Sequence, residues 1–201
     1  MRAIAVREAR ARSIWLEVFQ SWSRILNFET LKDARRGGGF DVELFGNLFD
    51  LELTRREDQL VRALTGPIVR QDLDNFTTGL GPLTIDTLAR NQIGRLVVEL
   101  SRGQKRALRE QLVLLFAEGP TDEILMGISS ATGLTARQAR SVQNLRRRLI
   151  RDGVPSGSAV RRAQEHARRL LRRRARLIAR TESVRFTALL VDERGAQVAG
   201  M

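Results

Sequence analysis

The chain has 201 residues, of which 42% are hydrophobic, and a formal net charge of +12, a composition that allows a domain with a buried core and excludes a chain disordered throughout. It contains no cysteine and a single histidine, which excludes a disulfide framework and most zinc chemistry. No apolar run near the N-terminus reaches the length of a signal peptide or a membrane span, so we expect a soluble intracellular protein.

Residues 1–34 have the pattern of one amphipathic helix. Apolar side chains recur there at spacings of three and four, at Ala11, Trp15, Val18, Trp22 and Ile25. We expect both tryptophans to be buried in the core or against a neighbouring subunit. The three glycines within residues 34–39 end this helix and predict a flexible linker.

Residues 40–53 contain two similar pieces, FDVEL and FDLEL, on either side of Gly46 and Asn47. Alternation of apolar and polar residues around a Gly-Asn pair predicts a β-hairpin, and an amphipathic helix is the alternative. In the hairpin, acids face each other as an acidic patch, made of Asp41, Glu43, Asp50 and Glu52. The patch is either a solvated outer face, which we favour, or a surface that meets arginines of this chain, a sister subunit or a partner.

From residue 54 the pattern is helical again. Thr54 with Glu57 forms a predicted capping box, and Pro67 interrupts that helix. Thr84 is the predicted N-cap of a helix that ends near residue 100, and a second predicted helix continues from residue 101 to Gly119.

A short helix is predicted from Thr121 to Gly133, and the next from Thr135 to Gly153. Ser156 or Ser158 opens a final predicted helix that runs through about Val191. Its apolar stripe is narrow and rich in alanine, at Val160, Ala163, Ala167, Leu171, Ala175 and Ile178. We therefore expect a mainly α, elongated protein with four segments: an N-terminal helix (1–34), a linker and acidic hairpin (35–53), a helical core (54–153), and a long basic helix with a tail (154–201).

Positive charge is concentrated in one segment. Residues 137–185 hold sixteen arginines, no lysine and three acids, so the remainder of the chain is close to neutral. Three interpretations compete: contact with DNA or another polyanion, docking to an acidic protein surface, and a solvated face. We favour polyanion contact, because this segment cannot neutralise itself. The candidate contact residues are Arg146, Arg147, Arg148, Arg161, Arg162, Arg168, Arg169, Arg172, Arg173 and Arg176.

No catalytic constellation is recognisable. The one histidine, His166, stands among arginines in a helical segment, without a recognisable nucleophile or metal-ligand motif beside it. We expect a protein that is not an enzyme and that uses no cofactor, metal or small-molecule substrate.

Two stretches together resemble a known family. GLTARQA is followed by an arginine-rich helix, a loop and then RARLIARTE, and this order is similar to the phage head-morphogenesis, or minor head protein, family (phage Mu F-like). The resemblance covers about residues 90–195. The matching positions are Gly133, Leu134, Thr135, Gln138, Ala139, Arg174, Ala175, Ile178, Ala179, Arg180, Thr181 and Glu182. Family members commonly continue into a small module with tryptophan, aspartate and histidine, and this sequence ends at Met201 before any such module.

The resemblance implies a minor structural protein in the head of a phage or a phage-derived particle such as a gene transfer agent. It implies a location near the portal vertex, with host cytoplasm as the site of assembly, and contact with the portal protein, other head proteins and packaged DNA. We also expect self-association and no membrane contact. Within the motif, we expect Arg180 and Glu182 to make separate buried or interfacial polar contacts, because neighbours two apart on a helix do not face each other.

A helix-turn-helix DNA-binding regulator is the alternative function. Residues 121–133 and 135–151 would supply its two helices. Base reading would then require Gln138, Gln143 or Asn144 to point outward beside the arginines.

Overall fold

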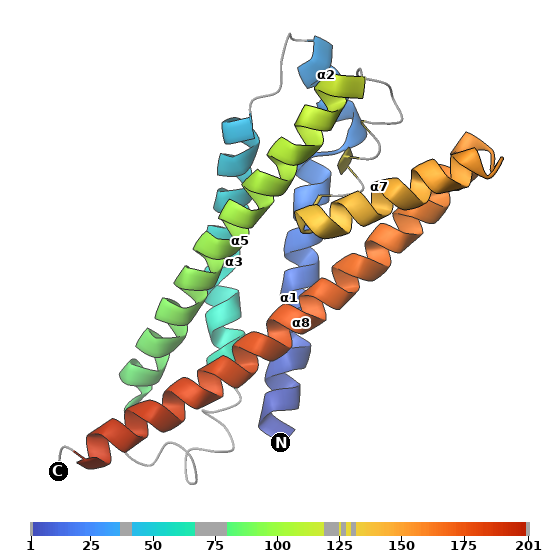
Figure 1. The fold of residues 1–201 in the computed structure, drawn as a ribbon. Helices are drawn as coiled ribbons and strands as arrows, with labels where there is room; N and C mark the ends of the chain where they lie inside the picture. The colour runs from blue at the N-terminus through green and yellow to red at the C-terminus, as the bar shows by residue number, and fades with distance from the viewer. Residues whose placement is uncertain are drawn as a thin grey trace. The chain divides into compact units, whose positions relative to one another are not determined.

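The computed structural model describes residues 2–36, 42–66, 80–118 and 132–199, together with residues 125, 128 and 129. The described residues include no β-strand, and the mainly α class is confirmed. Figure 1 shows the helices, which are α1 (Arg2–Ile25), α2 (Phe28–Arg36), α3 (Val42–Thr65), α5 (Pro82–Glu118), α7 (Ala136–Arg151) and α8 (Ser156–Ala199).

The chain divides into two compact units. Unit 1 comprises Met1–Glu17, Leu53–Val98 and Ala175–Met201, and unit 2 comprises Val18–Glu52 and Glu99–Arg174. Each unit has its own buried aromatic side chains: Trp15 and Phe186 in unit 1, and Phe19, Trp22 and Phe49 in unit 2. The expected burial of both tryptophans is confirmed.

The predicted hairpin at residues 40–53 is wrong, because residues 42–53 form the first half of α3. The same residues satisfy a helical period: Phe45, Phe49 and Leu53 lie four apart and are 5%, 0% and 0% exposed. Gly46 lies inside the helix instead of at a turn, and a methyl group there would collide with the Lys105 side chain of α5. Its lack of a side chain therefore admits Lys105 close to the α3 backbone. Phe40 and Asp41 lie outside the described residues.

The predicted helix of residues 1–34 is broken at Leu26 and Asn27. The Asn27 side-chain oxygen accepts a hydrogen bond from the Thr30 backbone amide at 2.9 Å, as expected of an asparagine at a helix N-terminus. The new helix, α2, places Leu31 in the core of unit 2, fully buried.

Two predicted helix starts are also wrong. Thr54 lies in the middle of α3, and Thr84 lies inside α5, which begins at Pro82. Proline suits the first helical position, where its missing N–H leaves no bond unmade. The two helices predicted for residues 85–119 are one continuous helix, in which Gly103 is tolerated at a cost of about 1 kcal/mol relative to alanine.

The predicted start and end of α7 and the predicted start of α8 are confirmed. The Thr135 hydroxyl accepts from the Gln138 backbone amide at 3.3 Å, and the Gln138 side chain accepts from the Thr135 amide at 3.1 Å, which completes a capping box. Gly153 ends α7 with φ +81°, a conformation that favours glycine. α8 begins at Ser156, as predicted, and continues to Ala199, beyond the expected end at Val191.

Candidate polyanion-binding surface

In unit 2, α7 folds back along the first part of α8 (Figure 1). The contact is made by small and medium apolar side chains, at Leu134, Ala139, Val142, Ala163 and Ala167, with Leu170 and Leu171 packed beside them. Alanine at the contact positions permits close approach of the two helices. The alanine-rich stripe predicted for the final helix is therefore its packing face here.

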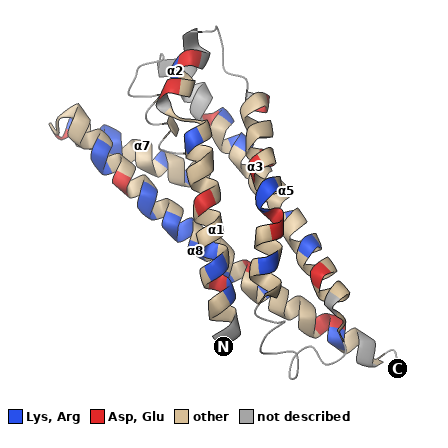
Figure 2. Cartoon of the chain, turned by 180° about the vertical axis from the view of Figure 1, so that it is seen from behind, with Lys and Arg blue, Asp and Glu red and all other residues tan. Residues whose placement is uncertain are grey.

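The arginines cover the outer faces of this helix pair. Of the ten candidate contact residues, Arg146 is half-buried and the others are exposed. Figure 2 shows Lys and Arg in blue along both α7 and the part of α8 beside it. Nine of these ten arginines lie in unit 2, and Arg176 lies two positions past its boundary on α8. Packing and charge are thus separated by face on the same two helices.

Among the described residues, Asp152 is an acid that pairs with arginines at the end of α7. Asp152, at the end of α7, lies 3.6 Å from the Arg148 guanidinium and 4.0 Å from that of Arg151. Both ion pairs are exposed, where such pairs contribute little. Three acids against sixteen arginines in residues 137–185 leave a surplus that must be balanced by solvent ions or by a ligand.

Five of the family-like positions build the turn that starts α7. Gly133 has φ +83°, Leu134 is fully buried, Thr135 and Gln138 make the capping box, and Ala139 is buried. A methyl group on Gly133 would lie 3.0 Å from Leu171 Cδ2 and 3.3 Å from Phe19 Cβ. Both the backbone conformation and the lack of space therefore require glycine at this position.

Arg174 is the one family-like arginine that is buried, at 8% exposed. Its guanidinium donates a hydrogen bond to the Gly133 carbonyl oxygen and lies 5.2 Å from the centre of the Phe19 ring. Burial lowers the pKa of Arg174 to about 10. The group remains protonated near neutral pH, and it ties α8 to the turn before α7.

The remaining family-like positions lie on the continuation of α8 in unit 1. Ala175, Ala179 and Glu182 are buried, Ile178 is half-buried, and Arg180 and Thr181 are exposed. The expectation of a buried contact thus holds for Glu182, and Arg180 instead faces solvent. The motif is a mixture of packing, polar and surface positions.

Glu182 has a buried partner. The Gln92 side-chain amide of α5 donates to the Glu182 carboxylate at 2.7 Å and to the Glu182 backbone oxygen at 2.8 Å. Arg185 adds an ion pair at 3.2 Å. These bonds satisfy a carboxylate that is 4% exposed, so they fix how α8 packs on α5 within unit 1.

Two polar residues of unit 1 were missed by sequence analysis. Arg7 is 4% exposed, donates to the Thr187 hydroxyl at 3.0 Å and lies 5.9 Å from the centre of the Phe186 ring. Arg7 lies four residues before Ala11 and so continues the apolar stripe of the first helix. This position could have predicted its burial. Gln92 likewise adjoins the buried Ile93.

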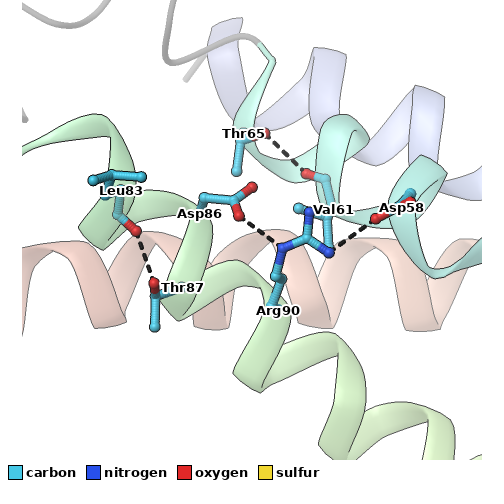
Figure 3. Close-up of polar contacts among 7 residues, drawn as sticks. All are labelled: Asp58, Val61, Thr65, Leu83, Asp86, Thr87 and Arg90. Atoms are coloured by element: carbon cyan, nitrogen blue, oxygen red, sulfur yellow. Dashed lines mark hydrogen bonds and ion pairs between the residues drawn. The ribbon is translucent and has the colours of Figure 1, made fainter.

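Elsewhere in unit 1, an exposed ion-pair network joins α3 and α5 (Figure 3). Arg90 donates to Asp86 at 2.7 Å and to Asp58 at 2.9 Å. The hydrogen bonds to these two carboxylates raise the pKa of Arg90, and the bond to Asp86 has the larger effect. The network therefore reinforces the charged state of Arg90.

A solvated face is the favoured interpretation of the predicted acidic patch, but two of its acids, Glu43 and Asp50, contact cations of α5. Within unit 2, Glu43 pairs with Arg109 and lies 3.9 Å from Lys105, whose ammonium is 3.1 Å from Asp50. The Ser101 hydroxyl also donates to Asp50. Glu52 is 9% exposed, and Asp41 lies outside the described residues. The described acids are thus distributed along one helix and do not form the ribbon face that was expected.

Of the three side chains proposed for base reading, two are half-buried and one is exposed. The Gln138 side chain is used by the capping box and is half-buried, and Gln143 is also half-buried. Asn144 is exposed. Most of residues 121–131, the proposed first helix of a helix-turn-helix, lie outside the described residues.

His166 is half-buried, with Nε2 3.4 Å from the Ser141 hydroxyl. A serine nucleophile would need a closer base and a group that orients the other ring nitrogen. The described residues supply no hydrogen bond to that nitrogen, and the pair forms a polar contact between α7 and α8. The same residues contain no cluster of acids and histidine that could hold a metal ion.

No protein-family model, curated protein or solved structure matches this chain. Among the described helices, none is both long and apolar enough to cross a membrane.

Proposed function

We propose that this chain is a minor structural protein of a phage or phage-like head, located near the portal vertex, which contacts packaged DNA through the arginines of α7 and α8. The observation that carries the DNA contact is the surface of exposed arginines on unit 2, whose charge the local acids cannot balance. The assignment to a head rests on the resemblance described above. The proposal assigns no catalytic residue, cofactor or metal.

Arginine suits this role physically. Its planar guanidinium presents several donors to phosphate oxygens and stays charged at any physiological pH. Arg161, Arg168 and Arg172 follow one side of α8, at intervals of about 10 and 6 Å along the helix axis. A row of this kind can contact successive phosphates without reading bases, as expected for a protein that must accept any packaged sequence.

The family-like residues of unit 2 have a consistent role in this proposal. Gly133 and Arg174 connect the start of α7 to α8, and the capping box fixes the first turn of α7. These contacts hold the two arginine-bearing helices in one arrangement. The motif would then serve as the support of the binding surface, and the exposed arginines would make the contacts.

The regulator alternative has less support, because the candidate base-reading amides are largely engaged or half-buried. The two functions are separated by comparing the affinity for random-sequence duplex DNA with the affinity for DNA that flanks the gene of this protein. Equal affinity at physiological salt supports the structural role, and a preference of about a thousandfold or more would establish a regulator.

The location of the protein tests the other half of the proposal. Purified particles from the producing cells can be labelled with an antibody to this chain and imaged by electron microscopy. Labelling at one vertex of opened heads is the expected result. Absence of the protein from purified particles, with free protein in the lysate, would contradict a structural role in the head.

A further inference from the structure

The part of α8 in unit 1 has two opposite apolar faces. One is buried and holds Ala175, Ala179, Phe186 and Leu190. On the other face, Leu177, Val184 and Val191 are 52%, 50% and 50% exposed. A helix that is apolar on two faces is expected to be covered on both, because exposed apolar rows are unfavourable in water.

The exposed face has the period of a coiled-coil contact. Its residues alternate spacings of four and three, in the order Leu177, Thr181, Val184, Ala188, Val191 and Gly195. All six are exposed, and we call them the α8 seam. The larger apolar residues recur every seven positions, and the positions between them are small, so a second helix can approach closely. At Gly195 an added methyl group would meet no atom within 4 Å.

The charges beside the seam restrict what can cover it. Arg180 and Arg194 flank one side, and Arg185 and Asp192 flank the other. In a parallel pair of two copies, Arg180 would lie beside Arg185 of the second copy, and like charges at these positions oppose pairing. Glutamate or aspartate at the same positions of another helix would pair with the arginines. In a parallel arrangement the flanking charge therefore favours an acidic helix over a second copy.

We propose that the α8 seam is a docking site for an amphipathic helix of another protein, with an apolar row at heptad spacing and acidic residues on both sides of that row. The partner helix lies along α8 in this mode of binding. Its apolar residues supply affinity, and the arginines beside the seam set the register and the choice of partner. The residues are distinct from the α7 and α8 surface of unit 2. Failure of DNA binding would thus leave this proposal intact.

The probe is a synthetic three-heptad peptide with leucine at the seam positions and glutamate at the flanking ones, and the control peptide has lysine at the flanking positions. Binding to the full chain is measured by fluorescence anisotropy. We expect the glutamate peptide to bind at least about tenfold more tightly than the lysine peptide. Equal binding of the two peptides, or none, would overturn the proposal.

Two variants with the same substitution locate the contact. Val184→Glu places a charge in the seam, and Val98→Glu does so on α5, where the valine is 54% exposed. The first should weaken binding of the glutamate peptide about tenfold or more, and the second should leave it close to wild type. Equal effects would show that the peptide does not use the seam.

Two further measurements exclude other occupants. Sedimentation should show no self-association through the seam. Self-association of the wild type that Val184→Glu abolishes would make a second copy the occupant. The melting temperatures of Val184→Glu and Val98→Glu, without peptide, should agree. A much lower value for Val184→Glu would mean that this chain covers its own seam, and would overturn the proposal.

Discussion

The guanidinium of Arg174 on α8 donates a hydrogen bond to the carbonyl oxygen of Gly133, 41 positions earlier in the chain. Both residues belong to the family-like motif, and both lie in unit 2. Arg174→Met should lower the free energy of unfolding by about 1–3 kcal/mol, because a buried carbonyl loses its charged donor. Chemical denaturation followed by circular dichroism measures the change.

Arg173→Met is the matched control for that substitution. Arg173 is the preceding residue on α8 and is exposed, so its loss should change the free energy of unfolding by no more than about 0.5 kcal/mol. Equal losses for the two variants would show that the contact with Gly133 adds nothing to stability.

Gly133 and Gly153 allow the energetic cost of backbone conformation to be measured apart from the cost of crowding. Their φ angles are +83° and +81°, but an added methyl group meets Leu171 and Phe19 at Gly133 and nothing within 4 Å at Gly153. Gly153→Ala should cost about 1 kcal/mol from conformation alone, and Gly133→Ala should cost distinctly more. Thermal melts of both variants provide the comparison. A cost at Gly153 equal to or above that at Gly133 would contradict the packing described around Arg174.

The pH dependence of Arg174 has a defined sign. Burial lowers its pKa in the folded state to about 10, below its value in the unfolded chain. Between these values the unfolded state binds more protons, so this group makes the protein more stable as the pH rises through that window. Below about pH 9 the group is charged in both states and adds no slope.

The measurement is the difference in the free energy of unfolding between wild type and Arg174→Met, followed from pH 6 to pH 11. It should be constant to about pH 9 and then change in favour of wild type. A difference that varies between pH 6 and 8 would show that another titrating group is coupled to this position.

The buried and exposed polar contacts of unit 1 should differ in strength. A double-mutant cycle on Gln92 and Glu182, with alanine at each position, should give a coupling of about 1.5–3 kcal/mol, because the acceptor is a buried carboxylate. The same cycle on Arg90 and Asp86, exposed on α5 (Figure 3), should give a much smaller coupling. Added salt should reduce the second coupling and leave the first nearly unchanged.

Local patterns predicted much of the fold. The Thr135 N-cap, the glycine that ends α7, the start of α8 and the burial of Trp15 and Trp22 all follow from residues close in sequence. The hairpin failed because alternation and helical period coincide in a short apolar segment. In a helix, one face holds Phe45, Phe49 and Leu53. In a strand, one face likewise holds Phe49 and Leu53, so the pattern fits both structures.

The candidate site was predicted in composition and not in detail. Charge counting located the arginine-rich segment, and the structure exposes nine of the ten candidate arginines. Arg174 is not one of these ten, and its burial depends on Gly133 and Phe19, which are remote in sequence. Charge counting alone does not distinguish Arg174 from Arg173, whereas the family resemblance assigns Arg174 to packing and leaves Arg173 among the contact residues.

The salt dependence of duplex DNA binding tests the central claim most directly. Affinity for random-sequence DNA should fall with salt, with a log–log slope of about 0.9 per phosphate neutralised. Arg168→Gln with Arg172→Gln should reduce that slope by about 2, and the control pair Arg12→Gln with Arg95→Gln, exposed arginines of unit 1, should leave it unchanged. No binding, or an equal loss of slope in both double variants, would contradict a DNA-binding surface on α7 and α8.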